Sequence, residues 1–248
     1  MSLMSQKLQA VHASIQAAAA AVSRRPDSVA LLAVSKTFGA DMVLEAIAAG
    51  QRAFGENYLQ EAVAKMAAVA LALQAGHDAA VVQPLPEWHF IGPIQSNKTR
   101  PIAENFAWAH TVEREKIAQR LSEQRPPHLP PLNICLQVNI SGEASKSGMA
   151  PADVLAAARA IVGLPRLQLR GLMAIPAPTE DLQEQHAAFR QTRELLQQLQ
   201  AELPVHAAQL DTLSMGMSAD MAVAIEEGAT IVRVGSAIFG QRERTIQS

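Results

Sequence analysis

The sequence predicts a single parallel (β/α)8 barrel of the TIM-barrel class, preceded by one extra N-terminal helix. Eight short apolar runs alternate with longer helical patterns along 248 residues, a length that suits one α/β barrel. Most runs are continuously apolar, as is typical of parallel strands covered on both faces. No glycine-rich dinucleotide fingerprint follows the first run, which disfavours the rival open, doubly wound sheet.

Residues 1–25 are expected to form a packing helix ahead of the first strand. The stretch is rich in alanine, and its apolar residues recur at helical spacing, at Leu8, Val11, Ile15 and Val22. The first acidic residue is Asp27, as in a targeting peptide, but a basic segment followed by a strongly apolar block is missing. We therefore interpret residues 1–248 as one barrel domain.

The strands and helices are expected to alternate in the order that a barrel requires. The predicted strands are Val29–Ser35, Arg52–Glu56, Trp88–Ile91, Phe106–Thr111, Leu132–Ile140, Leu167–Ile175, Thr212–Met215 and Thr230–Val234. The predicted helices between them are Asp41–Ala49, Glu61–Leu73, Glu113–Glu123, Pro151–Val162, Leu182–Leu203 and Asp220–Glu227. Gly50 and Gly228 stand where helix C-terminal caps would fall, and Pro151 suits a first helical turn.

The composition narrows the classes of function. The formal net charge of −2 gives no electrostatic reason to expect binding to nucleic acid or to an anionic membrane surface. No apolar run approaches the roughly 20 residues of a membrane span. The single cysteine, Cys135, excludes an internal disulfide and a cysteine-based metal cluster, and it favours a reducing, cytoplasmic setting. His89 and His110 lack further ligands at metal-binding spacing, so we expect structural or cofactor-adjacent histidines.

Lys36 ends the first predicted strand after a run of apolar and small residues. Functional side chains of a barrel lie at the C-terminal ends of strands and in the loops that follow. An amine at an apolar barrel mouth is partly desolvated, which leaves more of it neutral and able to attack an aldehyde. Taken alone, however, such a lysine is more often a side chain that extends to solvent.

Two loops near the end of the chain predict a phosphate site. Leu213–Ser218 ends the seventh predicted strand and Val232–Ala237 ends the eighth, and each leads into a loop where barrels commonly bind phosphate. Gly216 and Gly235 would let the backbone approach a phosphate closely. Asp220 argues slightly against this interpretation, because a carboxylate competes with an anion for the start of a helix.

Arg233 lies inside the apolar eighth strand, and a buried guanidinium needs a partner because it cannot deprotonate. Two interpretations stay open: a pair with a carboxylate such as Glu56, or contact with the pyridine nitrogen of pyridoxal 5′-phosphate (PLP). An arginine discourages protonation of that nitrogen and makes the cofactor a poorer electron sink than an aspartate would. The second interpretation therefore favours limited carbanion chemistry, or none.

Seven short blocks in one order carry a resemblance to a known family. They are Ala33–Phe38, Phe54–Tyr58, Trp88–Lys98, Ser145–Met149, Gly171–Pro176, Leu213–Ser218 and Val232–Gly240. Together they resemble the pyridoxal phosphate homeostasis proteins, from about residue 29 to the C-terminus. That family has the fold of the N-terminal barrel of alanine racemase, binds PLP through the lysine of the first strand, and is implicated in intracellular PLP supply and amino-acid balance.

The resemblance implies PLP as the cofactor and Lys36 as the Schiff-base lysine. It places Arg233 near the pyridine nitrogen. It implies a phosphate site at Ser214, Ser218, Gly235 and Ser236, and a ring lined by Asn57 and Met173. The family has no established enzymatic activity, so the resemblance implies a PLP-binding protein, with the apo forms of PLP-dependent enzymes as candidate recipients.

Two other functions remain to be weighed. An amino-acid racemase needs two bases on opposite faces of the substrate, and racemases of this barrel type add a C-terminal β domain and a tyrosine from the neighbouring subunit. The chain ends soon after the eighth strand and its only tyrosine is Tyr58, so we expect a monomer and no racemase. A barrel enzyme acting on a sugar phosphate would explain the phosphate loops but leave Lys36 and Arg233 unassigned.

Overall fold

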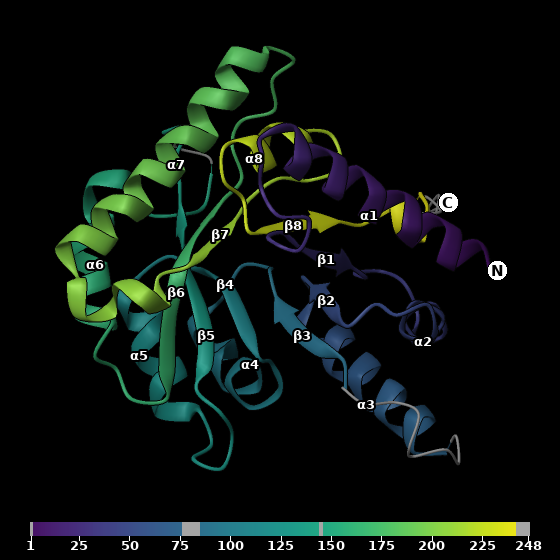
Figure 1. The fold of residues 1–248 in the computed structure, drawn as a ribbon. Helices are drawn as coiled ribbons and strands as arrows, with labels where there is room; N and C mark the ends of the chain where they lie inside the picture. The colour runs from purple at the N-terminus through teal and green to yellow at the C-terminus, as the bar shows by residue number, and fades with distance from the viewer. Residues whose placement is uncertain (1, 76–84, 144–145, 242–248) are drawn as a thin grey trace, which may run out of the picture.

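The computed structural model describes residues 2–75, 85–143 and 146–241, so Ser145 of the fourth sequence block lies outside the described residues. Within these ranges, eight parallel strands close into a barrel in sequence order (Figure 1). They are β1 (Ala30–Val34), β2 (Ala53–Glu56), β3 (Glu87–Phe90), β4 (Trp108–Val112), β5 (Leu132–Val138), β6 (Leu167–Ala174), β7 (Thr212–Ser214) and β8 (Ile231–Val234).

The pairing of the first and last strands separates the two predicted folds. β1 pairs with β8 in parallel, with Leu32 opposite Arg233, whereas an open sheet would leave an edge between them. The predicted (β/α)8 barrel is therefore confirmed. Each strand stands where an apolar run predicted it, and its ends differ from the prediction by two residues at most.

Helices surround the barrel and cover the outer faces of its strands (Figure 1). They are α1 (Leu3–Ala21), α2 (Ala40–Ala48), α3 (Leu59–Ala75), α4 (Thr99–Asn105), α5 (Glu115–Gln124), α6 (Val154–Ile161), α7 (Leu182–Glu202), α8 (Met221–Glu226) and α9 (Ser236–Phe239). The sequence did not predict α4 and α9, which are too short to show a helical period. The expected helix at Pro151–Val162 begins as a 3-10 turn and becomes α6 only at Val154.

The predicted N-terminal helix is present as α1 and packs beside α8 (Figure 1). The Ser2 hydroxyl caps its start by accepting from the Ser5 amide at 3.1 Å. After its end, the Arg24 guanidinium donates to the carbonyl oxygens of Ile225 and Ala229 at 2.7 and 2.8 Å. These bonds connect the segment after α1 to the C-terminal end of α8 and to the loop that leads into β8.

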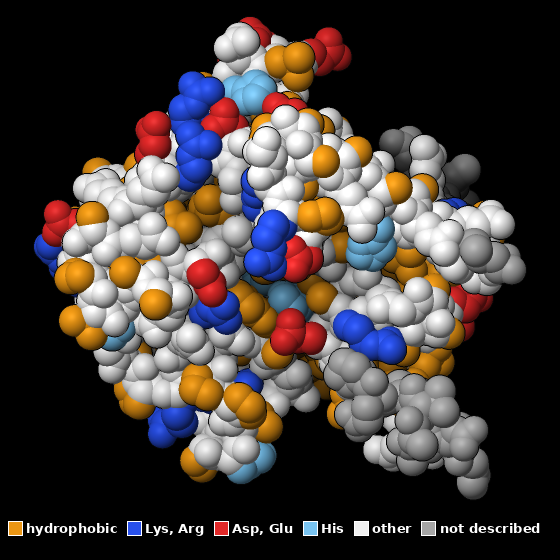
Figure 2. Space-filling view, in the orientation of Figure 1, with side chains coloured by type: hydrophobic (Ala, Val, Ile, Leu, Met, Phe, Trp, Pro, Cys, Tyr) orange, Lys and Arg blue, Asp and Glu red, His pale blue; other side chains and the backbone are white. Residues whose placement is uncertain are grey.

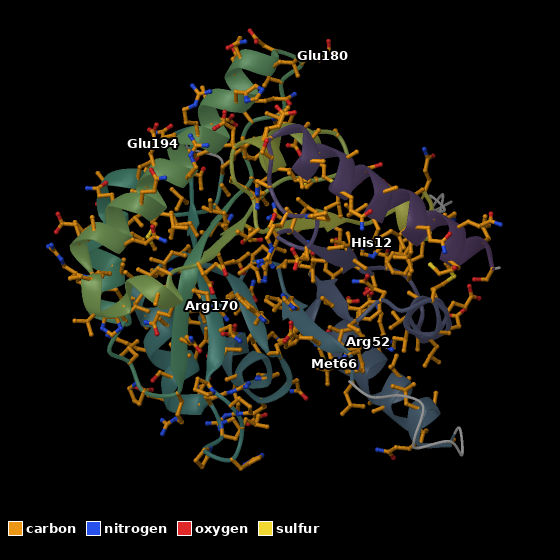
Figure 3. The ribbon with its side chains drawn as sticks, in the orientation of Figure 1. His12, Arg52, Met66, Arg170, Glu180 and Glu194 are labelled. Carbon is orange, nitrogen blue, oxygen red and sulfur yellow. The ribbon has the colours of Figure 1, made fainter. Side chains whose placement is uncertain are left out.

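The outside of the molecule carries charges of both signs. Figure 2 shows acidic and basic side chains interspersed on one face, with apolar atoms between them. Arg170 on β6 is labelled in Figure 3. Its guanidinium pairs with Asp211 at 2.6 Å and lies 5.0 Å from the centre of the Trp108 ring. Among the described residues, no helix has both the length and the apolar character needed to cross a bilayer.

Candidate cofactor-binding site

A cavity of about 710 Å³ opens at the C-terminal ends of the strands, the end of a barrel where functional sites lie. Its lining comes from the ends of β1, β2, β6 and β8 and from the loops that follow β7 and β8. The structure brings seven of the eight predicted site residues together in this lining: Lys36, Asn57, Met173, Ser218, Arg233, Gly235 and Ser236. The eighth, Ser214, lies elsewhere.

Lys36 is half-buried and lies two residues after the end of β1. The residues on either side of it are anchored: the Ser35 amide donates to the Gly55 carbonyl at 3.0 Å, and the Thr37 amide donates to Glu61 Oε1 at 2.6 Å. Thr37 has a φ of +69°, which costs a non-glycine residue on the order of 1–3 kcal/mol. The backbone at Thr37, immediately after Lys36, is therefore held in a conformation of raised energy.

A second lysine, Lys65, binds the chain at Ser35, next to Lys36. Lys65 is buried, and its Nζ donates to the Ser35 carbonyl at 2.7 Å, to Glu56 Oε1 at 2.6 Å and to Glu61 Oε1 at 3.0 Å. The Ser35 hydroxyl also donates to Glu56 Oε1, at 2.6 Å. This cluster of charged side chains holds the end of β1 against α3, and no pattern in the sequence predicted it.

Arg233 forms part of the cavity floor and is only 4% exposed. Its Nη1 donates to the carbonyl and hydroxyl oxygens of Ser214 at 2.7 and 2.9 Å, and its Nη2 donates to the Ala174 carbonyl at 3.1 Å. The suggested pair with Glu56 is wrong, because Glu56 bonds to Lys65 instead. Burial lowers the pKa of Arg233 to about 10, so the guanidinium stays charged at neutral pH.

These bonds leave the guanidinium with donors to spare. Arg233 has five N–H donors, and the three bonds to Ser214 and Ala174 use three of them. Two donors remain for a ligand in the cavity. A cation with spare donors suits a ring nitrogen that offers a lone pair.

Ser214 differs from the other predicted residues because its side chain is fully buried below the cavity. Its hydroxyl lies 2.8 Å from His110 Nδ1 and accepts from Arg233. Successive residues of a strand point to opposite sides, so the serine that ends β7 faces the barrel interior. Ser218, four positions further along the loop, is exposed and lines the cavity.

The two predicted phosphate loops stand side by side at the cavity. The Gly216 carbonyl accepts from the Arg233 amide at 3.0 Å, which links the loop after β7 to β8. Gly235 leaves little room for a side chain, since a Cβ there would lie 3.1 Å from the Val34 carbonyl oxygen. The Asp220 carboxylate accepts from the Met217 amide at 2.6 Å, so one loop amide is already used within the turn.

The residues present fit PLP. Lys36 supplies an amine, Arg233 a cation with spare donors, and Ser218 and Ser236 supply hydroxyls beside the backbone of two loops. Asn57 Oδ1 is buried with no hydrogen-bond partner among the described residues, which costs about 1–3 kcal/mol unless a ligand or water supplies a donor. A hydroxyl on a bound aromatic ring would satisfy that oxygen.

Two histidines and a cysteine occupy the interior below this site. His89 and His110 are buried and bonded to each other, His89 Nδ1 to His110 Nε2 at 2.9 Å. The described part of the chain contains no cluster of metal-ligating side chains, and the histidines connect to the cavity through Ser214 and Arg233. Burial raises the pKa of the Cys135 thiol to about 12, in line with the expected inert core residue.

Comparison with known proteins connects this geometry to a family. Residues 7–243 match the family model described as the N-terminal domain of alanine racemase. A pyridoxal phosphate homeostasis protein of Pseudomonas aeruginosa is 59% identical over 98% of this chain and 97% of its own length. Its counterpart in Escherichia coli K12 is 49% identical over 95% of each chain.

Solved structures agree with the sequence relatives. PipY of Synechococcus elongatus PCC7942, determined with PLP bound, is 36% identical and has a TM-score of 0.79. The alignment covers 96% of this chain and all of PipY, 100%. Alanine racemase from Corynebacterium glutamicum is 17% identical with a TM-score of 0.57, and 62% of that chain is covered. This second likeness concerns the fold alone.

Proposed function

Since the chain belongs to the family of pyridoxal phosphate homeostasis proteins, we propose that it holds PLP as a Schiff base on Lys36 and takes part in PLP supply inside the cell. It is a PLP-binding protein with no established reaction of its own. The observation that carries the assignment of Lys36 is the cavity, which unites the lysine with a buried arginine and with the loops after β7 and β8.

PLP, when bound, supplies an aldehyde, and condensation with the Lys36 amine forms a C=N bond and releases one water. In the proposal Ser218, Gly235 and Ser236 hold the phosphate, with Ser214 acting from below rather than in the lining. Met173, 1% exposed at the end of β6, packs against the ring beside Asn57.

Arg233 favours binding of the cofactor over PLP-dependent catalysis. A guanidinium donates a hydrogen bond to the ring nitrogen and keeps that nitrogen unprotonated, which weakens the ring as an electron sink. Among the described residues that line the cavity, Lys36 is the only one whose side chain ordinarily acts as a general base. A racemase needs two bases, so we propose storage and delivery of PLP rather than racemisation.

The proposed setting follows from the same features. We propose that the protein acts as a monomer in the cytoplasm and hands PLP to the apo forms of PLP-dependent enzymes. A single buried cysteine suits a reducing compartment. Light scattering of the purified protein measures the mass, and a dimer would contradict the monomer.

Replacement of the attachment lysine tests the assignment. Wild-type protein incubated with PLP should show the visible absorption band of a Schiff base, and borohydride reduction should fix the pyridoxyl group on Lys36. The variant Lys36→Ala should lose the band, while Lys116→Ala, which removes an exposed amine on α5, should keep it. A wild-type protein that cannot be loaded would refute PLP binding, and a label on another lysine alone would refute Lys36.

A separate measurement distinguishes a carrier from a racemase. We expect no enzyme-like exchange of the α-proton when the PLP-loaded protein is incubated with alanine in deuterated water. Catalytic turnover in that assay would overturn the non-enzymatic role while leaving the Schiff base in place.

A further inference from the structure

A chain of polar side chains crosses the barrel interior below the cavity. Arg233 Nη1 donates to Ser214 Oγ at 2.9 Å, and that oxygen lies 2.8 Å from His110 Nδ1. His110 Nε2 lies 2.9 Å from His89 Nδ1, and His89 Nε2 lies 2.9 Å from Glu87 Oε1. The Glu87 side chain is 50% exposed at the start of β3. The chain thus joins the guanidinium at the cavity to a carboxylate at the opposite end of the barrel.

The donors and acceptors of this chain fit together in one direction. An ionised carboxylate only accepts, so His89 donates to Glu87 from Nε2. A neutral imidazole has one donor and one acceptor, so His89 Nδ1 accepts from His110 Nε2. His110 Nδ1 then accepts the hydroxyl proton of Ser214, and the hydroxyl oxygen accepts from Arg233. Every hydrogen in the chain points away from the cavity.

The charge states that this direction requires agree with the surroundings. Burial, the largest effect, lowers the pKa of both histidines, and the neighbouring His89 and Arg233 lower that of His110 further. The hydrogen bond from His89 is the main cause that lowers the pKa of Glu87. At neutral pH both imidazoles are therefore neutral and the carboxylate is ionised.

We propose that Glu87, His89, His110 and Ser214 form a positioning relay that orients Arg233 toward the cofactor ring. The Ser214 hydroxyl accepts from Arg233 because it donates its own proton to His110. The Glu87 carboxylate, at the other end of the relay, determines this direction because it sets the tautomers of His89 and His110. This inference rests on the proposed function for the identity of the ligand, but the order of the relay belongs to the protein alone.

The relay also explains how the ring nitrogen meets a donor without receiving a proton. No histidine in the relay carries a proton directed at Arg233, and the guanidinium itself holds its proton at neutral pH. The ring nitrogen is thus offered a hydrogen bond only. Loss of the exposed acceptor at Glu87 would free both imidazoles to change tautomer, which would let Ser214 turn its proton elsewhere and loosen Arg233.

The histidine tautomers of the ligand-free protein test the relay directly. Nitrogen-15 NMR of wild-type protein above pH 7 should show the Nε2–H form for His89 and for His110. Glu87→Ala should give mixed tautomers, and Glu87→Gln should restore the wild-type pattern because an amide oxygen also accepts from Nε2. An Nδ1–H form at either histidine of the wild type, or an unchanged pattern in Glu87→Ala, would overturn the relay whether or not the protein binds PLP.

Cofactor binding tests what the relay does. Ser214→Ala should bind PLP about tenfold more weakly, as expected when a hydrogen bond to a charged group is lost, and should shift the absorption maximum of the Schiff base while Lys36 still forms it. The matched control is Ser122→Ala, a buried serine that donates to the Pro165 carbonyl at 2.6 Å outside the barrel interior.

The two serine variants separate positioning from general stability. Ser122→Ala should reduce the free energy of unfolding but leave the PLP affinity and the absorption maximum unchanged. Equal affinities and equal spectra for the two variants would refute a positioning role for Ser214. Failure of the wild type to bind PLP would instead refute the proposed function, and the tautomer pattern would still decide the relay.

Discussion

The two halves of the barrel interior treat their polar groups in opposite ways. Below Arg233, the ring nitrogens of His89 and His110 and the hydroxyl of Ser214 all have hydrogen-bond partners. In the cavity above, Asn57 Oδ1 is buried without a partner among the described residues, and Arg233 keeps two spare donors. A folded protein rarely leaves buried polar atoms unpaired, so Asn57 Oδ1 and the spare donors of Arg233 support the proposal that a ligand binds in this cavity.

Position, and not depth, separates the two lysines near Ser35. Lys65 is more deeply buried than Lys36, and burial alone would make it the better candidate for a reactive amine. Its nitrogen, however, donates to three oxygens outside the cavity lining, and an ammonium that gives three hydrogen bonds has no lone pair for an aldehyde. Lys36 lines the cavity, and this position is the reason for proposing it as the attachment point.

The largest expected effect comes from breaking the buried ion pair between Lys65 and Glu56. Lys65→Met should lower the free energy of unfolding by about 3–5 kcal/mol, because it strands the buried carboxylate of Glu56 without its cation. Urea unfolding measures the change. The matched control is Arg159→Met, which breaks an ion pair with Glu202 of the same 2.6 Å length but with both side chains exposed, and should cost less than about 1 kcal/mol. Similar losses in the two variants would contradict the buried cluster.

The pH dependence of stability tests the lower half of the barrel. The pKa of His110 is held well below its ordinary value in the folded protein, so below about pH 6.5 the unfolded chain binds more protons and stability falls. His110→Gln should be less stable at pH 7 yet lose less stability between pH 7 and 5, by up to about 1.4 kcal/mol per pH unit. The control His128→Gln, at an exposed loop position, should keep the wild-type slope of unfolding free energy against pH. If that slope is also unchanged in His110→Gln, His110 is not buried in its neutral form.

Much of the fold could be predicted because the strands of a parallel barrel appear in the sequence as apolar runs. Strands covered on both faces carry few polar residues, and the eight runs correspond to the eight strands of the structure. The short helices α4 and α9 left no such signal, since seven and four residues hold too little of a helical period. Their existence depends on tertiary packing rather than on local preference.

The site could be predicted in part for the same reason. Lys36, Ser218 and Ser236 come directly after strands or in the loops beyond them, and closure of the barrel brings such positions to one end. The orientation of Ser214 could not be predicted, because a shift of one residue turns a strand side chain to the other face. Nor could the partner of Arg233, since Glu56 and Ser214 were both available in the sequence and only the three-dimensional arrangement separates them.

The smallest expected change in stability comes from replacing Asn57, and it tests whether the Asn57 oxygen is unpaired in the ligand-free protein. Asn57→Ala removes an oxygen that has no partner among the described residues, so the free energy of unfolding without PLP should change by less than about 0.5 kcal/mol, while PLP affinity should fall severalfold. Asn133→Ala is the matched control, because the Asn133 amide donates to the Ala107 carbonyl at 3.3 Å and its Oδ1 accepts from Arg170 at 3.0 Å, and it should cost at least about 1 kcal/mol of stability. Calorimetric unfolding with and without PLP measures both variants. Destabilisation of ligand-free Asn57→Ala equal to that of Asn133→Ala would mean that the Asn57 oxygen already has a partner in the ligand-free protein.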